Sequence, residues 1–249
     1  LTELADRQPL VLGLDDLHEG DPSTWELVDY LARNPIDAPI LLIASVRSDR
    51  ASVPGRLGQL LSTLLQDGLG TEVRLRALDR AAIGELATDA RGLGQTSPEA
   101  ADWLFERSLG NPLFAVALLQ ELEGDPAGHV VPVSVKERVR AMTVRLSPQP
   151  RAVLQLAAVL GPTFSLRTIG SLLPAGEDQW LDELVALGLL AEHTGENGAA
   201  YDFVHPLIHE AVYEEMGAAR RRRLHQQVAE GLTGASTTAL AYHAARGAL

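Results

Sequence analysis

The 249-residue chain contains no cysteine and a single lysine, Lys136. The lack of cysteine excludes disulfide bonds and metal sites with cysteine ligands, and it is compatible with a cytoplasmic protein. No apolar run approaches the roughly eighteen residues of a membrane span, and residues 1–8 do not have the pattern of a signal peptide. We therefore expect a cytoplasmic chain that does not enter a membrane.

Acidic residues dominate the charge and are unevenly spread. The formal net charge is -12, from 33 Asp and Glu against 21 Lys and Arg. Half of this excess lies in residues 1–50, which hold ten acids and four arginines. This balance argues against nucleic-acid binding by the chain as a whole. The basic cluster Arg220–Arg223 is opposed by Glu210, Glu214 and Glu215, so we interpret it as an exposed helix face.

Up to about residue 78 the hydrophobic pattern alternates between strand and helix, in a chain long enough for one large or several small domains. The elements expected in this region are a strand at 10–14, a helix at 22–33 capped by Asp21, a strand at 40–46, a helix at 57–65 and a weaker strand at 71–75. Alternation of this kind predicts a parallel sheet of buried strands with helices on its faces.

From residue 79 onward the pattern is mainly helical. The expected helix boundaries are Asp79 and Gly92 for the first helix, Ser97 and about Ser108 for the second, and Asn111 as the cap of the third. The composition of residues 124–132 predicts a linker.

A third group of elements follows the linker. Helices are expected at 134–145, 148–159 and 177–187, strands at 189–192 and 201–204, and a turn-rich loop, HTGENGA, between the strands. Three helices followed by a hairpin are the arrangement of a winged helix. Further helices are expected at 205–216, at 218–232 and from 237. The expected fold class is thus α/β followed by all-α.

Asp15 and Asp16 directly follow the first predicted strand. Two adjacent carboxylates repel each other and call for a positive partner. The carboxyl ends of parallel strands are where α/β sheets bind ligands. An apolar run that ends in Asp-Asp has the form of a Walker B strand, in which the first acid holds Mg²⁺ and the second orients or deprotonates the attacking water. Taken alone, the same pair is more often a solvated turn.

Five segments in a fixed order favour the Walker B interpretation. They are LVLGLDDLHEGDPSTWELVDYLA, ILLIASVRSD, SLGNPLFAVALLQEL, VPVSVKERVRAMTVRLSPQPRAVLQLAAVLGPTFSL and YDFVHPLIHEAVYEEM. Together they resemble the ATPase module of STAND-type, AAA-related signalling proteins, above all the large LuxR-family and MalT-like bacterial transcriptional regulators and related cyclase- and kinase-associated ATPases. The resemblance covers almost the entire chain. It implies the second half of a P-loop NTPase core at 1–78, a helical lid at 79–128, a winged helix at 129–216 and the start of TPR-like helical repeats at 217–249.

The same resemblance implies a site for ATP or ADP with Mg²⁺. Asp15 matches the metal-side acid and Asp16 the catalytic acid of the Walker B strand. Arg47, after the second strand, matches the sensor arginine that reads the γ-phosphate, and a guanidinium can contact phosphate oxygens in a bidentate way.

Two more positions match nucleotide-binding residues of the family. Gly110 and Pro112 match the lid motif whose proline packs near the base, although Asn111 as a cap and Pro112 in the first turn would explain the same residues. His205 matches the winged-helix histidine that contacts the β-phosphate of ADP, and a half-buried histidine at a helix start is an equal alternative. His205 and His209 have a metal-binding spacing, but no third ligand is evident.

A P-loop, G-x-x-x-x-G-K-[ST], is absent from the sequence, because Lys136 lies in PVSVKERVR without the preceding glycines. The family places this loop upstream of the Walker B strand, and the sequence begins with Leu1, so we interpret the chain as a fragment of a longer regulator. On this basis the chain alone is expected neither to bind ATP tightly nor to hydrolyse it. Any ATPase activity would belong to the longer protein.

Three functions remain as hypotheses. The leading one is part of a nucleotide-dependent signalling switch that also binds a protein partner or self-associates. The second is a degenerate, non-catalytic protein-interaction scaffold. A DNA-binding winged-helix regulator is third, because the charge disfavours direct DNA contact. The sequence has no G-x-S-x-G or H-E-x-x-H, and the glycines of RGLGQT follow a helix, which excludes a dinucleotide site.

Overall fold

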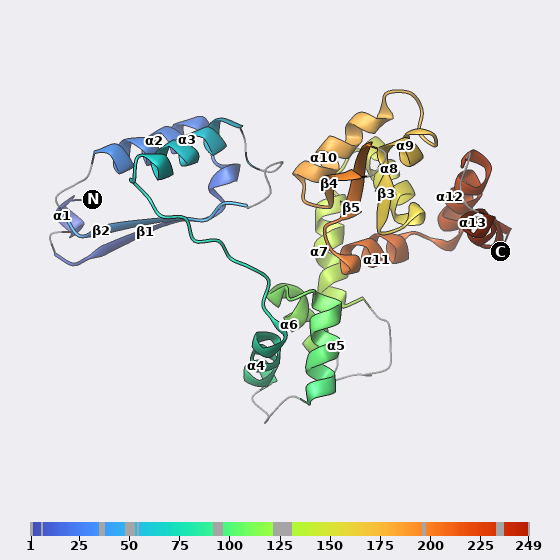
Figure 1. Cartoon of the computed structure of the whole chain (residues 1–249), viewed down its shortest axis with the longest axis horizontal. Coiled ribbons are helices and arrows are strands. Elements are labelled where there is room, and N and C mark those ends of the chain that lie inside the picture. The colour runs from blue at the N-terminus through green and yellow to red at the C-terminus, as the bar shows by residue number, and fades with distance from the viewer. Residues whose placement is uncertain are drawn as a thin grey trace. The chain divides into compact units, whose positions relative to one another are not determined.

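The computed structural model describes residues 2–5, 7–34, 38–47, 53, 55–91, 97–121, 131–195, 198–232 and 237–248. Within these residues the chain is a mixed α/β protein that is mostly helical and contains two small sheets. It divides into two compact units, Leu1–Leu75 and Arg76–Leu249 (Figure 1).

The first unit has a strand–helix–strand core. Its elements are α1 (Thr2–Ala5), β1 (Leu10–Leu14), the 3-10 helix η1 (Leu17–Glu19), α2 (Pro22–Arg33), β2 (Ile40–Ala44) and α3 (Gly55–Gln66). β1 and β2 are parallel neighbours, with Leu14 opposite Ala44. The Asp21 carboxylate accepts the Thr24 backbone N–H at 2.7 Å and so caps α2. The parallel pair and the cap are both confirmed.

Helices cover one face of this two-stranded sheet. α2 and α3 lie on the same side of β1 and β2 (Figure 1). The buried side chains of this unit's apolar cluster are Leu17, Trp25, Val28, Leu57 and Leu64. On the opposite face Val11, Leu41 and Ile43 are 61%, 55% and 52% exposed. The prediction of fully buried strands is therefore wrong, because a sheet covered on one side buries only alternate side chains.

Residues 71–75 do not form the predicted third strand. The segment has neither helix nor strand, and Val73 and Leu75 are 79% and 91% exposed. A strand needs a neighbour that accepts and donates its backbone hydrogen bonds. In the described part of the chain, β1 and β2 pair only with each other. The alternation of Val73 and Leu75 with polar residues therefore misled the sequence prediction.

The second unit begins with three packed helices, α4 (Arg80–Arg91), α5 (Pro98–Ser108) and α6 (Pro112–Glu121). Asp79, Ser97 and Asn111 each accept a backbone N–H from the first turn, at 2.8, 3.2 and 3.0 Å. All three predicted caps are therefore confirmed. Gly92 and most of the predicted linker lie outside the described residues.

Helices and a small antiparallel sheet follow. The elements are α7 (Val133–Thr143), α8 (Pro148–Leu160), β3 (Thr163–Ser165), α9 (Leu166–Gly170), the 3-10 helix η2 (Glu177–Gln179), α10 (Trp180–Ala186), β4 (Leu190–Gly195) and β5 (Gly198–Phe203). The sheet order is β3-β5-β4. β4 and β5 pair as far as Gly195 and Gly198, so most of the predicted HTGENGA loop is strand. The sequence analysis predicted neither β3 nor α9.

Three further helices complete the described chain, α11 (Pro206–Glu215), α12 (Ala218–Gly231) and α13 (Thr237–Ala248). The sequence analysis predicted all three. One apolar cluster extends through the second unit from Ile83 in α4 to Val228 in α12. None of the helices in the described ranges combines the length and the apolar character needed to cross a bilayer.

Candidate functional site

The two predicted Walker B acids lie at the end of β1, where they meet the residue that follows β2. The Ser45 hydroxyl donates a hydrogen bond to Asp15 Oδ1 at 2.5 Å and accepts one from the Asp16 backbone N–H at 2.8 Å. Backbone hydrogen bonds of 2.9 Å join Ser45 to Leu14 and to Leu17 on either side of the acids. Ser45 therefore fixes the Asp15 carboxylate. Sequence reasoning missed it, although a hydroxyl residue just past the neighbouring strand was a usable signal.

Both carboxylates are exposed, so water screens the repulsion between them that the sequence suggested. Asp16 adopts a left-handed conformation, φ 50° and ψ 48°, which aspartate tolerates better than most residues. The His18 side chain is 5% exposed, with Nδ1 lying 3.9 Å from Asp16 Oδ1 and Nε2 lying 3.7 Å from Glu19 Oε1. Its Nδ1 is buried and makes no hydrogen bond. His18 is the second residue that sequence reasoning missed.

Arg47 lies three positions beyond the end of β2 and is half-buried. Because β1 and β2 are parallel neighbours, the residues that follow them lie at the same edge of the sheet. The fold therefore gives Asp15, Asp16 and Arg47 a common location in the first unit.

The chemistry of this edge fits Mg²⁺ held through water. Asp15 has a second carboxylate oxygen that is not used by Ser45, and oxygen is the ligand that Mg²⁺ prefers. Across the described ranges, no group of three or more His, Asp or Glu side chains is placed to form a closed metal site. Mg²⁺ commonly keeps several waters and completes its shell with phosphate oxygens, and one or two protein carboxylates suffice for it.

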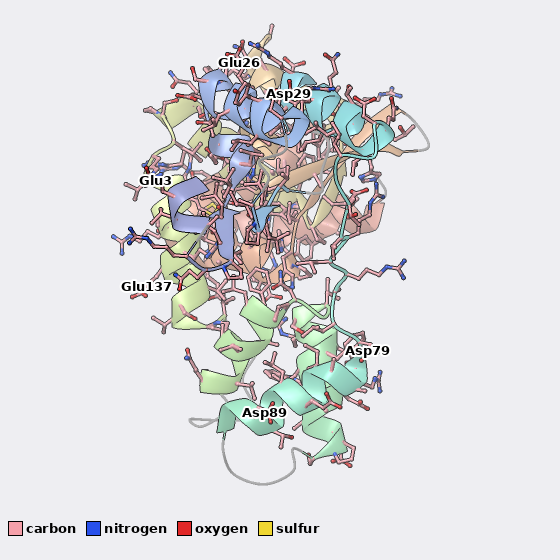
Figure 2. All side chains as sticks on the ribbon, turned by 90° about the vertical axis from the view of Figure 1, so that its left-hand side faces the viewer. Glu3, Glu26, Asp29, Asp79, Asp89 and Glu137 are labelled. Atoms are coloured by element: carbon pink, nitrogen blue, oxygen red, sulfur yellow. The ribbon has the colours of Figure 1, made fainter. Side chains whose placement is uncertain are left out.

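The acidic surface of the first unit is partly neutralised by local ion pairs. Glu26 and Asp29 point outward from α2 (Figure 2). Arg56 lies 2.6 Å from Glu26, and Arg33 lies 2.8 Å from Asp29 and 3.0 Å from Asp67. The arginines here are engaged with carboxylates, so this face does not offer the basic surface that a nucleic acid requires.

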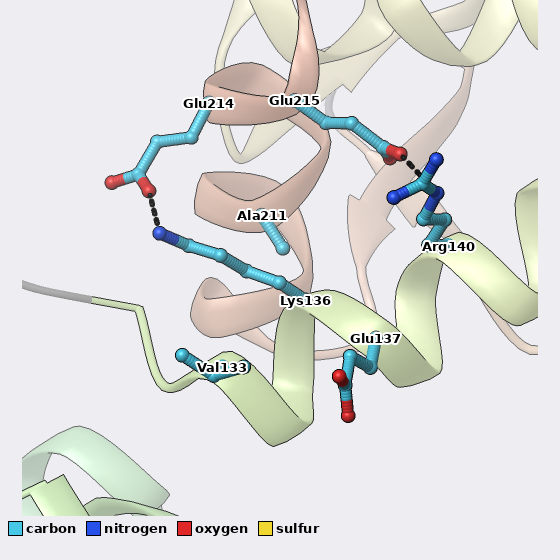
Figure 3. Close-up of a pocket in the computed structure, with 7 residues that line it drawn as sticks. All are labelled: Val133, Lys136, Glu137, Arg140, Ala211, Glu214 and Glu215. Carbon is cyan, nitrogen blue, oxygen red and sulfur yellow. Dashed lines mark ion pairs between the residues drawn. The ribbon is translucent and has the colours of Figure 1, made fainter.

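The single lysine belongs to a groove between α7 and α11 of the second unit (Figure 3). Lys136 Nζ lies 2.8 Å from Glu214 Oε2, and Arg140 Nε lies 3.8 Å from Glu215 Oε1. Each cation in the groove thus faces a carboxylate. Lys136 lies on a helix and not on a glycine-rich loop, so its position agrees with the absence of a P-loop from the sequence.

Gly110 and Pro112, the residues of the predicted lid motif, belong to the second unit, where Gly110 packs closely against the backbone of Leu78. Gly110 has φ +75°, and a Cβ at this position would lie 2.2 Å from the Leu78 carbonyl oxygen. Leu78 N–H donates to the Gly110 carbonyl at 2.8 Å. Pro112 occupies the first turn of α6, which Asn111 caps. The structural explanation of this motif therefore holds, and its contact with a nucleotide base stays a prediction.

His205 connects α11 to the helices that precede it. Its Nδ1 accepts the Leu207 backbone N–H at 3.1 Å, so the proton is on Nε2, which donates to the Ser108 carbonyl at 2.9 Å. The ring stacks on Phe114 with centroids 3.8 Å apart and is 4% exposed. Burial lowers the pKa of His205, which favours the neutral imidazole.

A bidentate ion pair lies beside His205. Arg107 on α5 donates to both carboxylate oxygens of Glu210 on α11, each at 2.8 Å. These hydrogen bonds are the main reason that the pKa of Arg107 is raised. His209 Nε2 donates to the Ala158 carbonyl at 2.9 Å, so His205 and His209 have separate hydrogen-bond partners. Sequence reasoning did not identify the Arg107–Glu210 pair.

The six predicted site residues fall into two groups. Asp15, Asp16 and Arg47 belong to the first compact unit, and Gly110, Pro112 and His205 belong to the second. Ser108 contacts two residues of the second group. Its carbonyl accepts a hydrogen bond from His205, and its hydroxyl accepts one from the Gly110 N–H at 3.2 Å.

Comparisons with known proteins give two partial likenesses. No protein-family model matches the chain. An uncharacterized protein of Rhizobium meliloti is 27% identical over 267 residues, an alignment that covers 98% of this chain and 25% of that protein. A Signal Transduction ATPase with Numerous Domains (STAND) protein with a tetratricopeptide repeat sensor, from Pyrococcus horikoshii, is 15% identical with a TM-score of 0.38. That likeness covers 96% of this chain and 33% of the archaeal chain. The chain therefore spans a quarter and a third of the lengths of these proteins.

Proposed function

We propose that this chain is part of a nucleotide-dependent signalling switch in a bacterial transcriptional regulator of the LuxR type. The observation that carries the proposal is the common location of Asp15 and Arg47, which follow adjacent parallel strands at one edge of the sheet. A carboxylate pair suits Mg²⁺, and a guanidinium suits phosphate oxygens. Parallel sheets bind ligands at this edge.

Each residue at the strand ends has a role in this proposal. Asp15 holds Mg²⁺ through water, Asp16 orients the attacking water, and Arg47 contacts the γ-phosphate. Ser45 keeps the Asp15 carboxylate in place through its hydroxyl. The phosphate-binding lysine must come from outside the 249 residues, since Lys136 is paired with Glu214. The chain alone therefore does not hydrolyse ATP.

The second unit supplies the responding part of the switch. In the proposal α4 to α6 form the lid, residues from α7 to α11 form a winged helix, and His205 contacts the β-phosphate of ADP. Both nitrogens of His205 are engaged within the chain, so a phosphate must displace the Ser108 carbonyl from Nε2. This exchange of partners would give the nucleotide different contact energies in two states, which is what a switch requires.

Calorimetry with Mg²⁺ and ATP or ADP tests the proposal. The protein to compare with this chain is its longer parent, extended upstream, and each is measured beside Asp15→Asn. We expect only the parent to bind ATP, and Asp15→Asn to weaken its Mg²⁺-dependent binding by about tenfold or more. Asp182→Asn, at an exposed carboxylate of α10, is the matched control and should leave binding unchanged. Unaltered ATP affinity in the parent's Asp15→Asn variant would contradict the assigned role.

A protein-interaction scaffold is the second candidate. The exposed sheet face of the first unit, with Val11, Leu41 and Ile43, is the observation that favours it, because contiguous apolar surface suits a protein partner. A parent protein that does not bind nucleotide at all would support this alternative over the switch.

A further inference from the structure

A chain of hydrogen bonds connects the last three helices of the second unit. Arg246 of α13 donates to Tyr213 Oη of α11 at 3.0 Å, and Tyr213 Oη lies 2.9 Å from His225 Nε2 of α12. His225 Nδ1 in turn lies 2.9 Å from His243 Nδ1 of α13. The two histidines are 1% and 5% exposed. Four polar side chains from three helices thus form one network, in which the two histidines are buried and Arg246 is exposed.

The proton positions in this network follow from the donors. A guanidinium can only donate, so Tyr213 Oη accepts from Arg246, and the tyrosine proton is free for His225 Nε2. His225 then carries its own proton on Nδ1 and donates it to His243 Nδ1. With both imidazoles neutral, all three hydrogen bonds are made at once. The direction of donation runs from Arg246 to His243.

The bond between the two imidazoles accommodates only one proton. A first added proton can go to His225 Nε2 if the Tyr213 hydroxyl turns to accept it. A second added proton places N–H groups on both Nδ1 atoms, which then face each other at a distance that suits a hydrogen bond. The doubly protonated pair therefore cannot keep this hydrogen bond between α12 and α13.

The surroundings of the pair are cationic or aromatic. The Arg221 guanidinium of α12 lies 5.3 Å from the Tyr213 ring centre, and that of Arg246 lies 4.6 Å from the Tyr242 ring centre. From α8, which also packs on α12, the contacting side chain is Gln155, which accepts from Arg220 at 3.1 Å.

Carboxylates near this region have other partners. On α11 they are Glu210, Glu214 and Glu215, which face Arg107, Lys136 and Arg140. On α12, Glu230 accepts from Gln226 at 2.8 Å, and no Asp or Glu follows it in the sequence. Among the described residues, therefore, no carboxylate contacts the network to favour a charged imidazole.

We propose that the His225–His243 pair is an acid-sensitive latch that holds α13 against α12 and α11 at neutral pH and releases it when both imidazoles are protonated. The latch rests on the geometry of the two Nδ1 atoms and does not depend on the proposed nucleotide site. It would couple the position of α13, and of any chain that continues from it, to proton concentration.

The direction of the pH effect follows from the pKa values. Burial, followed by the charges of His243, Arg246 and Arg221, lowers the pKa of His225 to about 4. Burial and Arg246 also lower the pKa of His243. The free imidazole titrates near 6.5, so the released form binds more protons between about pH 6.5 and 4. The latch is thus fully effective above about pH 6.5 and weakens as the pH falls toward 4.

Hydrogen exchange measured by mass spectrometry tests the latch in the whole 249-residue chain. Exchange of α13 amides is compared at pH 7.5 and pH 5.0 after correction for the intrinsic rates. We expect exchange in α13 to rise by about tenfold or more at pH 5.0. A difference of one bound proton between the released and the latched form shifts the equilibrium between them tenfold for each pH unit. Exchange in α8 should rise less, because α8 belongs to the apolar cluster of the unit.

Variants separate the latch from general acid destabilisation. His243→Asn places an amide oxygen near the position of Nδ1, which can accept from His225 without titrating, so the contribution of His243 is lost and the rise in α13 exchange should be smaller than in the unsubstituted chain by about threefold or more. His193→Asn is the matched control, because His193 is exposed and faces Asp202, and its response should equal that of the unsubstituted chain. Tyr213→Phe removes the hydroxyl and should raise α13 exchange at both pH values.

The latch is overturned by any of three results. One is an α13 exchange rate that does not change between pH 7.5 and 5.0. Another is an equal rise in α8 and α13, which would mean acid unfolding of the unit. The last is a His243→Asn variant that keeps the full pH response.

Discussion

The two compact units differ in how they hold their predicted site residues. In the first unit, Asp15 and Asp16 are exposed at a strand end beside a small core that covers one face of the sheet. In the second unit, His205 is 4% exposed and Gly110 lies against the backbone of Leu78. A substitution in the first group should alter chemistry with little effect on folding. A substitution in the second group will alter folding as well, so its functional effect needs a separate stability measurement.

The largest expected effect concerns the independence of the two cores. Leu57 of α3 and Leu184 of α10 are both fully buried. Leu184→Ala should lower the free energy of unfolding of the second unit by about 2–5 kcal/mol, and Leu57→Ala should destabilise the first unit by a value near the lower end of that range, because a small core collapses more readily. Denaturant titrations followed by tryptophan fluorescence check both. Trp25 reports on the first unit, and Trp103 and Trp180 report on the second.

Leu184→Ala should therefore move only the transition seen by the two tryptophans of the second unit. Two further variants separate the signals. In one, Trp103 and Trp180 are replaced so that only Trp25 remains, and in the other, Trp25 is replaced. Equal shifts in all three signals would show that the units unfold together, and the comparison between them would fail.

The next effect compares two glycines with similar backbone angles, Gly68 with φ +70° and Gly110 with φ +75°. A Cβ at Gly68 would meet no atom within 4 Å, whereas one at Gly110 would lie 2.2 Å from the Leu78 carbonyl oxygen. Gly68→Ala should cost about 1 kcal/mol from the left-handed conformation alone. Gly110→Ala should cost about 3 kcal/mol, because overpacking adds to that penalty. Thermal and denaturant unfolding measure both changes, and equal costs would contradict the close approach at Gly110.

The sequence predicted the second unit's helices better than the first unit's sheet. The caps Asp79, Ser97 and Asn111 are local signals, because the capping bond lies within the first helical turn. Whether 71–75 becomes a strand depends on a neighbour elsewhere, and no local pattern reports that. For the same reason, the sequence indicated apolar strands but not that one face would be exposed.

The candidate site shows the same limit. The places of Asp15 and Arg47 after two apolar runs were readable from the sequence, and their roles, which the family resemblance implies, stay predictions. The Arg107–Glu210 pair was not, since its partners are 103 positions apart and ordinary in their own segments. Ser45 was predictable in part. Its position just after β2 was readable from the sequence, but its hydrogen bond to Asp15 depends on the register of two strands.

A smaller effect compares ion pairs of the two units. The side chains of Arg107 and Glu210 are 20% and 30% exposed, whereas Arg56 and Glu26 are both 63% exposed. Double-mutant cycles with Arg→Met and Glu→Gln at each pair should give a coupling energy of about 1–2 kcal/mol for the first and below about 0.5 kcal/mol for the second. Burial and bidentate geometry explain the difference. Added salt should reduce the exposed pair's coupling further, and a larger coupling at Arg56–Glu26 would reverse this ranking.

The smallest expected effect on stability concerns the exposed face of the first unit's sheet. Val11 is 61% exposed on β1, and Val73 is 79% exposed in an irregular segment, so the same Val→Thr substitution can be made at both. Each should change the free energy of unfolding by less than about 0.5 kcal/mol, because neither side chain is in a core.

Self-association should nevertheless separate these two variants. Val11 belongs to an apolar surface with Leu41 and Ile43, and such a strand face promotes association between copies of the chain. Val11→Thr should therefore raise the concentration at which sedimentation velocity detects dimers by about tenfold, the factor expected when one apolar side chain is lost from a contact. Val73→Thr should leave it unchanged. If the two variants associate alike, the exposed face of the sheet is not the contact between copies. Leaving one face of the first unit's sheet uncovered would then have no consequence for association.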